Sequence, residues 1–291
     1  MKKSDQSQRF LFEDHPIRGQ HVSLDQSWQE IALQGGLDGR GLSLLGEALV
    51  VVSLLVDTLK IEGSVTLQIR GTGSLELLVV EANSKHEIRG TARQVGKIDA
   101  QMDLQQIFGS DVLVVTIKAE GAEPHQGIAS LRGINLSDAL EYYFATSEQL
   151  PTQFWLACDA TNASGMLVQK IPGKLKDGDA WDRVQHLAAT VTTDELQRLP
   201  LDDLLYRLFN EEILRIFDSH AIKFSCSCSR ERTSDMLLSL GKAEASEILG
   251  KEGEVSVTCD FCNSNYSFDQ IDIEQIFSEA AGTAPPGATT H

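Results

Sequence analysis

The sequence predicts an α+β protein in three parts: an N-terminal domain around an antiparallel sheet (residues 1–175), a helical linker (176–221) and a small C-terminal domain (222–279). Three observations lead to this prediction. Short runs of alternating apolar and polar residues, separated by turn residues, fill most of the first part. A polar, turn-rich stretch at 172–178 ends that pattern. Two close pairs of cysteines then follow near the C-terminus.

The first predicted helix is the most apolar stretch of the chain, residues 42–59. Because Glu47 and Asp57 lie within it, we expect a helix buried in a protein core and not a membrane span. Alternating residues at 65–69, a Gly-Thr-Gly turn and a second apolar run at 75–80 predict an antiparallel hairpin after the helix.

The remaining elements of the N-terminal domain follow the same patterns. We expect one sheet that contains all the strands, because hairpins pair neighbouring strands antiparallel. The predicted elements are a hairpin from 111–118 back toward Leu131, a helix at 137–147 that stops before Pro151, and strands at 154–158 and 166–171.

The linker is predicted to be helical. Helices are expected at 179–190, after the capping box formed by Thr192 and Glu195, and at 202–217. The last helix carries an apolar stripe too broad to stay exposed, so it packs on another part of the protein. The stripe alone favours a permanently core-facing helix over a surface that is released. Its residues are Leu204, Leu205, Leu208, Phe209, Ile213, Leu214 and Phe217.

Four of the five cysteines form two tight pairs, Cys226 with Cys228 and Cys259 with Cys262. Two cysteines one or two residues apart can both reach one ion, and structural Zn²⁺ takes four ligands. Thiolates favour zinc over calcium, magnesium or manganese, and the ferredoxin spacings of iron–sulfur clusters are absent. The sequence therefore predicts one zinc ion per chain, held by four thiolates.

Other roles for the cysteines are less compatible with the sequence. Scattered core cysteines would not fall into two pairs. A dithiol oxidoreductase needs its Cys-x-x-Cys motif at a helix start after a strand, whereas residues 254–258 and 266–268 alternate as in a hairpin. In a reducing compartment, such pairs are metal ligands or redox sensors and not permanent disulfides. Cys158 lies in an apolar strand and is predicted to be an inert buried thiol.

Composition argues against several classes of function. The formal net charge is −17, and from Lys223 onward five Lys or Arg face eleven Asp or Glu, so no basic surface for nucleic acid is expected. No secretory signal follows the first three residues, which predicts a cytoplasmic protein. The glycines match no nucleotide-binding motif, and no hydrolase or metalloprotease motif occurs. We therefore expect a protein that is not an enzyme.

The C-terminal domain is predicted to depend on its metal. Residues 221–277 surround a helical insert at 234–249 and are too few to build a large core. Structural Zn²⁺ contributes about 10–16 kcal/mol to folding at neutral pH, so its removal should unfold this block. The tail, 280–291, is rich in small residues and proline and is predicted to be disordered.

Several segments together resemble the heat shock protein 33 family of redox-regulated bacterial chaperones. The most specific are the two cysteine motifs with their surroundings, 224–232 and 257–262, followed by Tyr266 and Phe268. The resemblance covers nearly the whole chain. Supporting segments are 69–71, 80–82, 142–143 with 147–152, and 205–217 with Arg207, Glu211, Glu212 and Arg215.

The resemblance implies an ATP-independent holdase that is inactive while reduced and zinc-bound. Oxidation would form the disulfides Cys226–Cys228 and Cys259–Cys262, eject the zinc and unfold the small domain and then the linker. The linker stripe, with Leu204, Leu205, Leu208, Phe209, Ile213 and Phe217, and the sheet surface under it would then bind unfolding client proteins. The resemblance also implies a homodimer when oxidised. A zinc-dependent thiol oxidoreductase and a zinc-ribbon binding module remain as alternatives.

Overall fold

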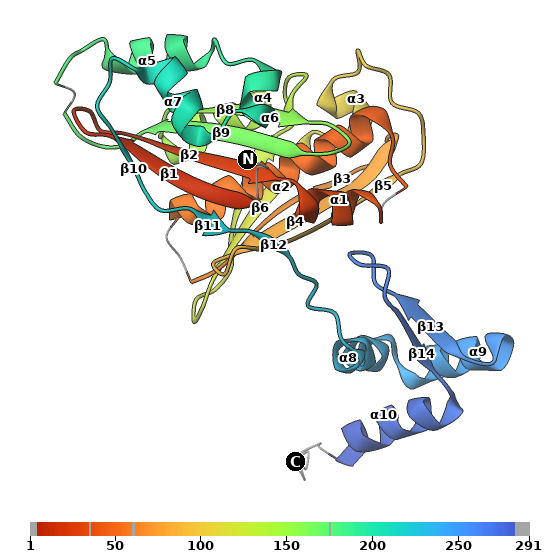
Figure 1. Cartoon of the computed structure of the whole chain (residues 1–291). Helices are drawn as coiled ribbons and strands as arrows, with labels where there is room; N and C mark the ends of the chain where they lie inside the picture. The colour runs from red at the N-terminus through yellow and green to blue at the C-terminus, as the bar shows by residue number, and fades with distance from the viewer. Residues whose placement is uncertain (1–4, 35, 60–61, 175, 283–291) are drawn as a thin grey trace, which may run out of the picture. The chain divides into compact units, whose positions relative to one another are not determined.

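The computed structural model describes residues 5–34, 36–59, 62–174 and 176–282. The chain forms two compact units, Met1–Ser225 and Cys226–His291. The first unit contains two six-stranded sheets, and the second contains one short hairpin with three helices (Figure 1).

The first sheet combines strands from both ends of the N-terminal unit. Its order is β10-β1-β2-β9-β8, with β11 paired to the start of β1, and all pairs are antiparallel. The strands are β1 (Gln6–Phe12), β2 (Ile17–Leu24), β8 (Thr152–Cys158), β9 (Ala163–Lys170), β10 (Leu214–Ile216) and β11 (His220–Ala221).

The second sheet is built from the hairpins in the middle of the chain. Its order is β12-β5-β4-β3-β6-β7, in which only the short contact of β12 with β5 is parallel. The strands are β3 (Gly63–Arg70), β4 (Leu75–Asn83), β5 (Glu87–Gln94), β6 (Val112–Ala119), β7 (His125–Ser130) and β12 (Lys223–Phe224). The antiparallel α+β class is confirmed, but the strands form two sheets instead of the single sheet expected.

Helix α2 (Gly39–Leu59) forms the core between the two sheets (Figure 1). It contacts β2, β8 and β9 of the first sheet and β3, β4 and β5 of the second. Its length and hydropathy would suit a membrane span, yet 72% of its most apolar window is buried inside the fold. The prediction of a buried helix is therefore confirmed, with a start at Gly39. Smaller helices close the edges: α1 (Gln26–Ala32), α3 (Leu104–Phe108), α4 (Leu136–Tyr143) and the π-helix η1 (Phe144–Glu148).

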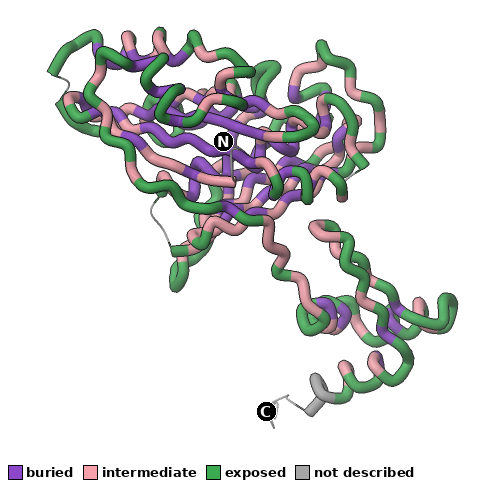
Figure 2. Tube along the Cα trace, viewed as in Figure 1, coloured by how far each residue is buried: buried purple, intermediate pink, exposed green. Residues whose placement is uncertain are grey.

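The linker helices cover the outer face of the first sheet (Figures 1 and 2). They are α5 (Ala180–Ala188), α6 (Thr193–Arg198) and α7 (Leu201–Phe209). The predicted capping box is present, since Thr192 accepts from the Glu195 N–H and Glu195 reaches back to the Thr192 N–H. Their apolar side chains form a second core with those of the sheet, separate from the core around α2.

The prediction of one helix over 202–217 is wrong. Helix α7 ends at Phe209, and the chain turns and continues as β10, which pairs with β1 over three residues. Strand β1 is otherwise an edge, and its backbone groups gain partners from β10 and β11 that a longer helix could not supply. In the second half of the predicted stripe, Leu214 lies in the edge strand β10, and Ile213 and Phe217 lie directly before and after it. The chain between α7 and the first cysteine pair thus contains three short strands instead of being helical throughout.

The C-terminal unit has a very small core. The hairpin β13 (Val255–Thr258) and β14 (Asn265–Phe268) packs with α8 (Arg230–Leu240), α9 (Lys242–Glu252) and α10 (Gln270–Gly282). Among its described residues, the buried apolar side chains are Leu237, Ala245, Val255, Phe268 and Ile273. The single helix expected at 234–249 is two helices, because Gly241 adopts φ +99°, which breaks the helix. Helix α10 extends into the predicted disordered tail as far as Gly282, and the rest of that tail lies outside the described residues.

Candidate metal centre

The two cysteine pairs lie on two loops of the C-terminal unit. Cys226 and Cys228 lie in the loop that leads into α8, and Cys259 and Cys262 lie in the turn between β13 and β14. In that turn the Cys259 N–H donates to the Ser264 carbonyl at 2.9 Å, and the Asn263 N–H donates to the Cys259 carbonyl at 2.9 Å. Asn263 takes the left-handed conformation, φ +54°, which asparagine tolerates better than most residues.

The four sulfur atoms converge on one point. All four lie within 4.8 Å of one another. The distances are 3.7 Å from Cys226 Sγ to Cys259 Sγ and 3.2 Å from Cys228 Sγ to Cys262 Sγ. Four sulfurs at about 2.3 Å from a tetrahedral Zn²⁺ would be about 3.8 Å apart, whereas a disulfide bond is about 2.05 Å. The cysteines are therefore unbridged thiols, and their spacing fits an ion that binds four sulfurs.

The backbone around the sulfurs favours their negatively charged form. The N–H groups of Phe261 and Cys262 bond to Cys259 Sγ, and the Cys228 N–H bonds to Cys226 Sγ. The Tyr266 hydroxyl donates to Cys228 Sγ at 3.2 Å. Hydrogen bonds of this kind support thiolates bound to a metal.

Burial and hydrogen bonding act on the thiols in opposite directions. Burial raises the pKa of Cys226 to about 12 and also raises the pKa of Cys259. Burial acts in the same sense on Cys262, but hydrogen bonds from the hydroxyl and N–H of Ser264 outweigh it and lower the pKa of Cys262 to about 6. A divalent cation at the centre would stabilise all four sulfurs as thiolates.

Two arginines hold the cysteine loop against the rest of the unit. Arg232 donates to the carbonyl of Ser227 at 3.0 Å and to its hydroxyl at 2.6 Å, between the first two cysteines. Arg230 pairs with Asp272 at 2.7 Å and lies 4.3 Å from the centre of the Phe268 ring. The two arginines fix the loop geometry that presents Cys226 and Cys228.

The structure separates the six residues predicted to bind clients into two groups. Four of them belong to the buried face of α7 and are at most 3% exposed: Leu204, Leu205, Leu208 and Phe209. Ile213 is 63% exposed in the turn after α7, and Phe217 is half-buried beside Arg9, so neither lies with the first four. Whether any of them contacts a client stays a prediction.

The sheet side chains that the linker packs on were not predicted from the sequence. The four buried linker residues pack on side chains from strands β1, β2, β8 and β9, which are Phe10, Phe12, Ile17, Ala157, Met166 and Val168. The only signal was the short apolar run Phe10-Leu11-Phe12, and the linker side chains that it packs against are distant in the sequence.

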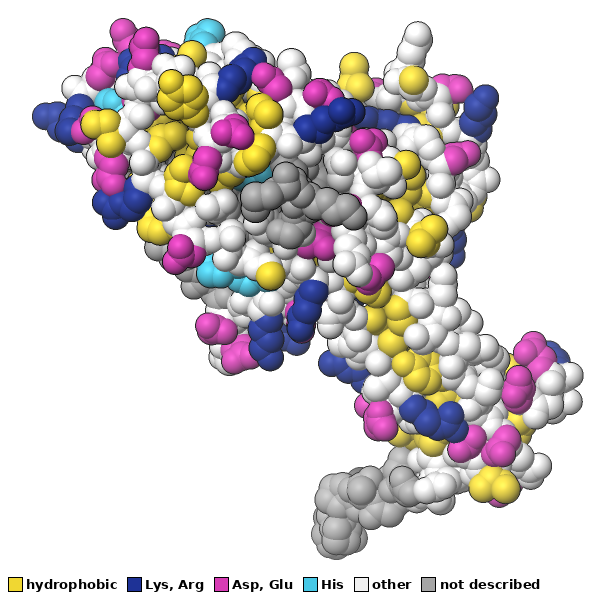
Figure 3. All heavy atoms as spheres, viewed as in Figure 1, with side chains coloured by type: hydrophobic (Ala, Val, Ile, Leu, Met, Phe, Trp, Pro, Cys, Tyr) yellow, Lys and Arg dark blue, Asp and Glu magenta, His cyan; other side chains and the backbone are white. Residues whose placement is uncertain are grey.

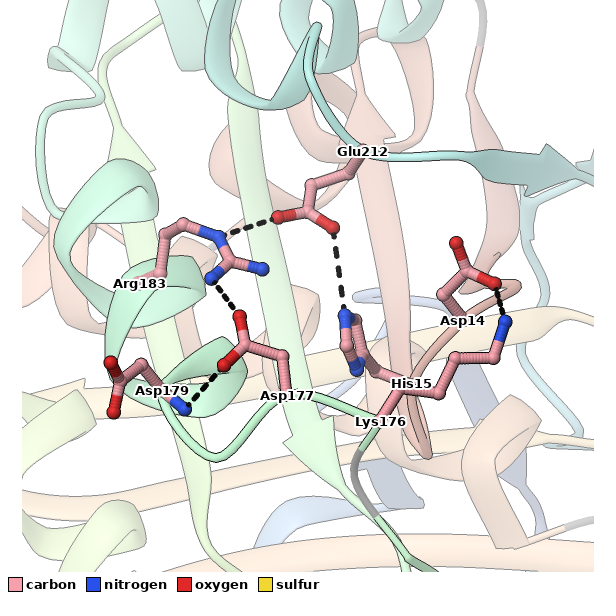
Figure 4. Close-up of polar contacts among 7 residues, drawn as sticks. All are labelled: Asp14, His15, Lys176, Asp177, Asp179, Arg183 and Glu212. Carbon is pink, nitrogen blue, oxygen red and sulfur yellow. Dashed lines mark hydrogen bonds and ion pairs between the residues drawn. The ribbon is translucent and has the colours of Figure 1, made fainter.

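A polar network also fastens the linker to the turn between β1 and β2 (Figure 4). Arg183 donates to Asp177 at 2.6 Å and to Glu212 at 2.8 Å, so it joins both ends of the linker helices. Glu212 lies 4.0 Å from the ring of His15, which belongs to the turn. Lys176 pairs with Asp14 in the same turn.

Among the described residues, the sulfur cluster contains the four cysteines alone, and His186, His220 and Cys158 lie outside it. The His186 ring bonds to the Asp182 carbonyl at 2.6 Å, and His220 stacks on His86. Burial, with the negative charges of Glu47 and Asp159, raises the pKa of Cys158, as expected for an inert thiol.

The chain matches the family model described as Hsp33 protein over residues 5–269. The chain belongs to the Hsp33 family. It is 42% identical to the 33 kDa chaperonin of Nitrosococcus oceani over 291 residues, and both chains are fully covered. It is also 42% identical to the 33 kDa chaperonin of Pseudomonas aeruginosa strain PAO1 over 298 residues, again with both chains fully covered.

A solved structure extends the match to three dimensions. The crystal structure of the 33 kDa chaperonin, or heat shock protein 33 homolog, of Thermotoga maritima matches with a TM-score of 0.81 and 25% identity. The match covers 96% of this chain and 99% of that one. The chain is thus an Hsp33-family chaperone with a cysteine cluster suited to a metal ion.

Proposed function

We propose that this protein is a redox-regulated, ATP-independent holdase that is inactive when reduced and zinc-bound. Oxidation of the four cysteines releases the ion, unfolds the C-terminal unit and frees the linker. The uncovered apolar surfaces bind unfolding proteins in the cytoplasm and prevent their aggregation under oxidative and thermal stress. The activated form is a homodimer, as the family resemblance implies.

The observation that carries the proposal is the pairing of a four-sulfur cluster with a unit that has almost no core. Four large apolar side chains and one alanine are buried in its described part. A unit of this size usually needs a metal or disulfides to stay folded, and zinc supplies about 10–16 kcal/mol. Loss of the ion is therefore expected to unfold the unit as a whole.

The oxidation chemistry balances with peroxide as the oxidant. One thiolate of a pair attacks the peroxide O–O bond, becomes a sulfenic acid and releases hydroxide. Its neighbour attacks that sulfur, and a disulfide forms with loss of a second hydroxide. Two peroxides thus convert Cys226 with Cys228, and Cys259 with Cys262, into two disulfides. The products no longer offer thiolates, so Zn²⁺ leaves.

The linker is placed to respond because it ends where the metal site begins. Strand β12 ends at Phe224, and the Ser225 N–H donates to the Ile88 carbonyl at 3.0 Å, directly before Cys226. Unfolding that starts at Cys226 removes the anchored end of this short strand. The preceding strands β11 and β10 hold only two and three residues on β1, so they are the next contacts to open.

Release of the linker would uncover apolar surface on both partners. Phe10, Phe12 and Met166 on the sheet are at most 1% exposed while the linker is docked. On the face seen in Figure 3, apolar side chains over the linker helices are interspersed with acidic and basic ones. The docked form therefore keeps its most hydrophobic face hidden, and opening creates the kind of large apolar patch that marks a binding surface. The net charge of −17 would help keep the opened protein soluble.

The proposal is tested by aggregation suppression of a thermally unfolding client. The reduced, zinc-loaded protein should suppress aggregation weakly, and the peroxide-treated protein strongly, in proportion to the amount of chaperone added and without ATP. A thiol oxidoreductase would instead turn over a dithiol substrate catalytically. If the reduced protein protects the client as well as the oxidised one does, the redox switch is refuted.

A further inference from the structure

A second candidate binding site lies in the N-terminal unit. A cavity of about 200 Å³ opens beside the inner face of the first sheet, at the C-terminal end of α2. Its walls are mainly apolar, and two arginines line it. The residues used below are Arg9, Leu11, Arg18, Leu167, Ile171 and Phe217.

The two arginines have neutral partners. The Arg18 guanidinium donates to the Gln169 side-chain oxygen at 2.6 and 3.0 Å and to the Thr58 carbonyl at 3.2 Å. The Arg9 guanidinium lies 5.3 Å from the centre of the Phe217 ring. Within the described part of the chain, neither guanidinium has an ion pair with a carboxylate.

The cavity therefore carries uncompensated positive charge. Burial lowers the pKa of Arg18, and the positive charge of Arg9 lowers it further. Asp57 also lines the cavity, but its carboxylate accepts from Ser7 and Gln20 and pairs with His86 at 2.8 Å. The Asp57 carboxylate thus already has three partners of its own, and an anion near the arginines would relieve their repulsion.

We propose that this cavity binds a small organic carboxylate. The carboxylate lies between Arg9 and Arg18, since guanidinium groups recognise carboxylates through paired hydrogen bonds. The apolar body of the ligand packs on Leu11, Ile171 and Phe217. A closed apolar cavity of about 150 Å³ accepts benzene, so a ligand the size of benzoate matches the space. The site uses none of the four cysteines, but its Phe217 wall belongs to the linker, so the cavity is complete only in the reduced protein with the linker docked.

The test uses the full-length, reduced, zinc-loaded protein and benzoate as the probe. Calorimetry should show saturable binding, and NMR should show shifts of the methyl groups of Leu11, Leu167 and Ile171, while that of Leu237 in the C-terminal unit stays unchanged. Arg9→Gln should weaken binding about tenfold or more, the effect of losing a charge-assisted hydrogen bond. Arg9→Lys keeps the positive charge but lacks the paired donors of a guanidinium. Its affinity for benzoate should lie between those of the wild-type protein and Arg9→Gln.

Controls separate this site from a general charge effect. Arg93→Gln removes an exposed arginine that pairs with Glu76 on the second sheet, and it should leave benzoate affinity unchanged. Benzyl alcohol has the ring of benzoate without its charge, and inorganic phosphate has the charge without the ring. Both should bind at least tenfold more weakly than benzoate. The proposal is overturned if benzoate fails to bind, if either probe binds as well as benzoate, or if Arg9→Gln and Arg93→Gln bind benzoate equally.

Discussion

Truncation of one buried linker leucine should open the linker without any oxidant. Leu205 on α7 is 1% exposed and packs within the apolar contact between the linker helices and the first sheet. Its neighbour Tyr206 is 75% exposed on the same helix. Leu205→Ala and Tyr206→Ala therefore shorten adjacent side chains, of which only that of Leu205 packs in the contact between linker and sheet.

The expected difference follows from the burial. A buried Leu→Ala change costs about 2–5 kcal/mol, through lost apolar contact and the cavity left behind. Surface changes usually stay within about 0.5 kcal/mol. About 1.4 kcal/mol corresponds to a factor of ten in an equilibrium constant. The fraction of molecules with an open linker should therefore increase by a factor between about 30 and several thousand for Leu205→Ala, and should change little for Tyr206→Ala.

The assay is native-state hydrogen exchange of α5 to α7 in the reduced, zinc-loaded protein, run beside aggregation suppression of an unfolding client. Leu205→Ala should accelerate exchange in these helices and raise suppression before any peroxide is added. Equal exchange rates and equal suppression for the two variants would refute the reasoning that this contact hides the client-binding surface.

Four further predictions concern the metal, the polar network of the linker and the core. Chelation of zinc under reducing conditions should abolish amide protection in residues 226–282, because about 10–16 kcal/mol of binding energy is lost; persistent protection would contradict the metal's structural role. Cys259→Ser should lower the zinc content per chain and speed proteolysis of the linker, and unchanged values of both would argue against it. Arg183→Gln leaves Glu212, whose side chain is 8% exposed, without its strongest partner, so chymotrypsin should cut the linker faster. The control Arg198→Gln removes an exposed ion pair and should leave the cleavage rate unchanged. Equal rates for the two variants would show that the contact of Arg183 with Glu212 does not hold the linker. Burial raises the pKa of Glu47 despite the nearby Arg40, so the folded state loses stability as pH rises above the usual value of 4.5. Glu47→Gln should therefore raise Tm near neutral pH, with a gain that shrinks toward zero below that pH, and a gain independent of pH would contradict the assignment.

The features that depend on local spacing could be predicted from the sequence. The hairpin around Cys259 and Cys262 was expected, because its two strands are close neighbours in the sequence. The capping box of Thr192 and Glu195 satisfies backbone groups within three residues, so it too is read locally. Helix α2 was identifiable because its apolar run is long and bears few charges.

The features that depend on distant pairing could not be predicted. Residues 210–217 continue the apolar spacing of α7, yet the chain turns there and Leu214–Ile216 pairs with β1, which lies about 200 residues earlier in the chain. Alternation also indicates a strand without saying which sheet it joins, so the division into two sheets was not visible. The contact of Arg183 with Glu212 joins residues that periodicity does not relate.

The central claim is that the metal site keeps the linker docked on the first sheet. The most direct measurement follows zinc release with a chelating dye and hydrogen exchange of α7 in the same samples after peroxide is added. We predict that α7 loses its protection as zinc leaves, with the strands β1, β2 and β9 of the sheet still protected. Complete zinc release with α7 fully protected would contradict the account.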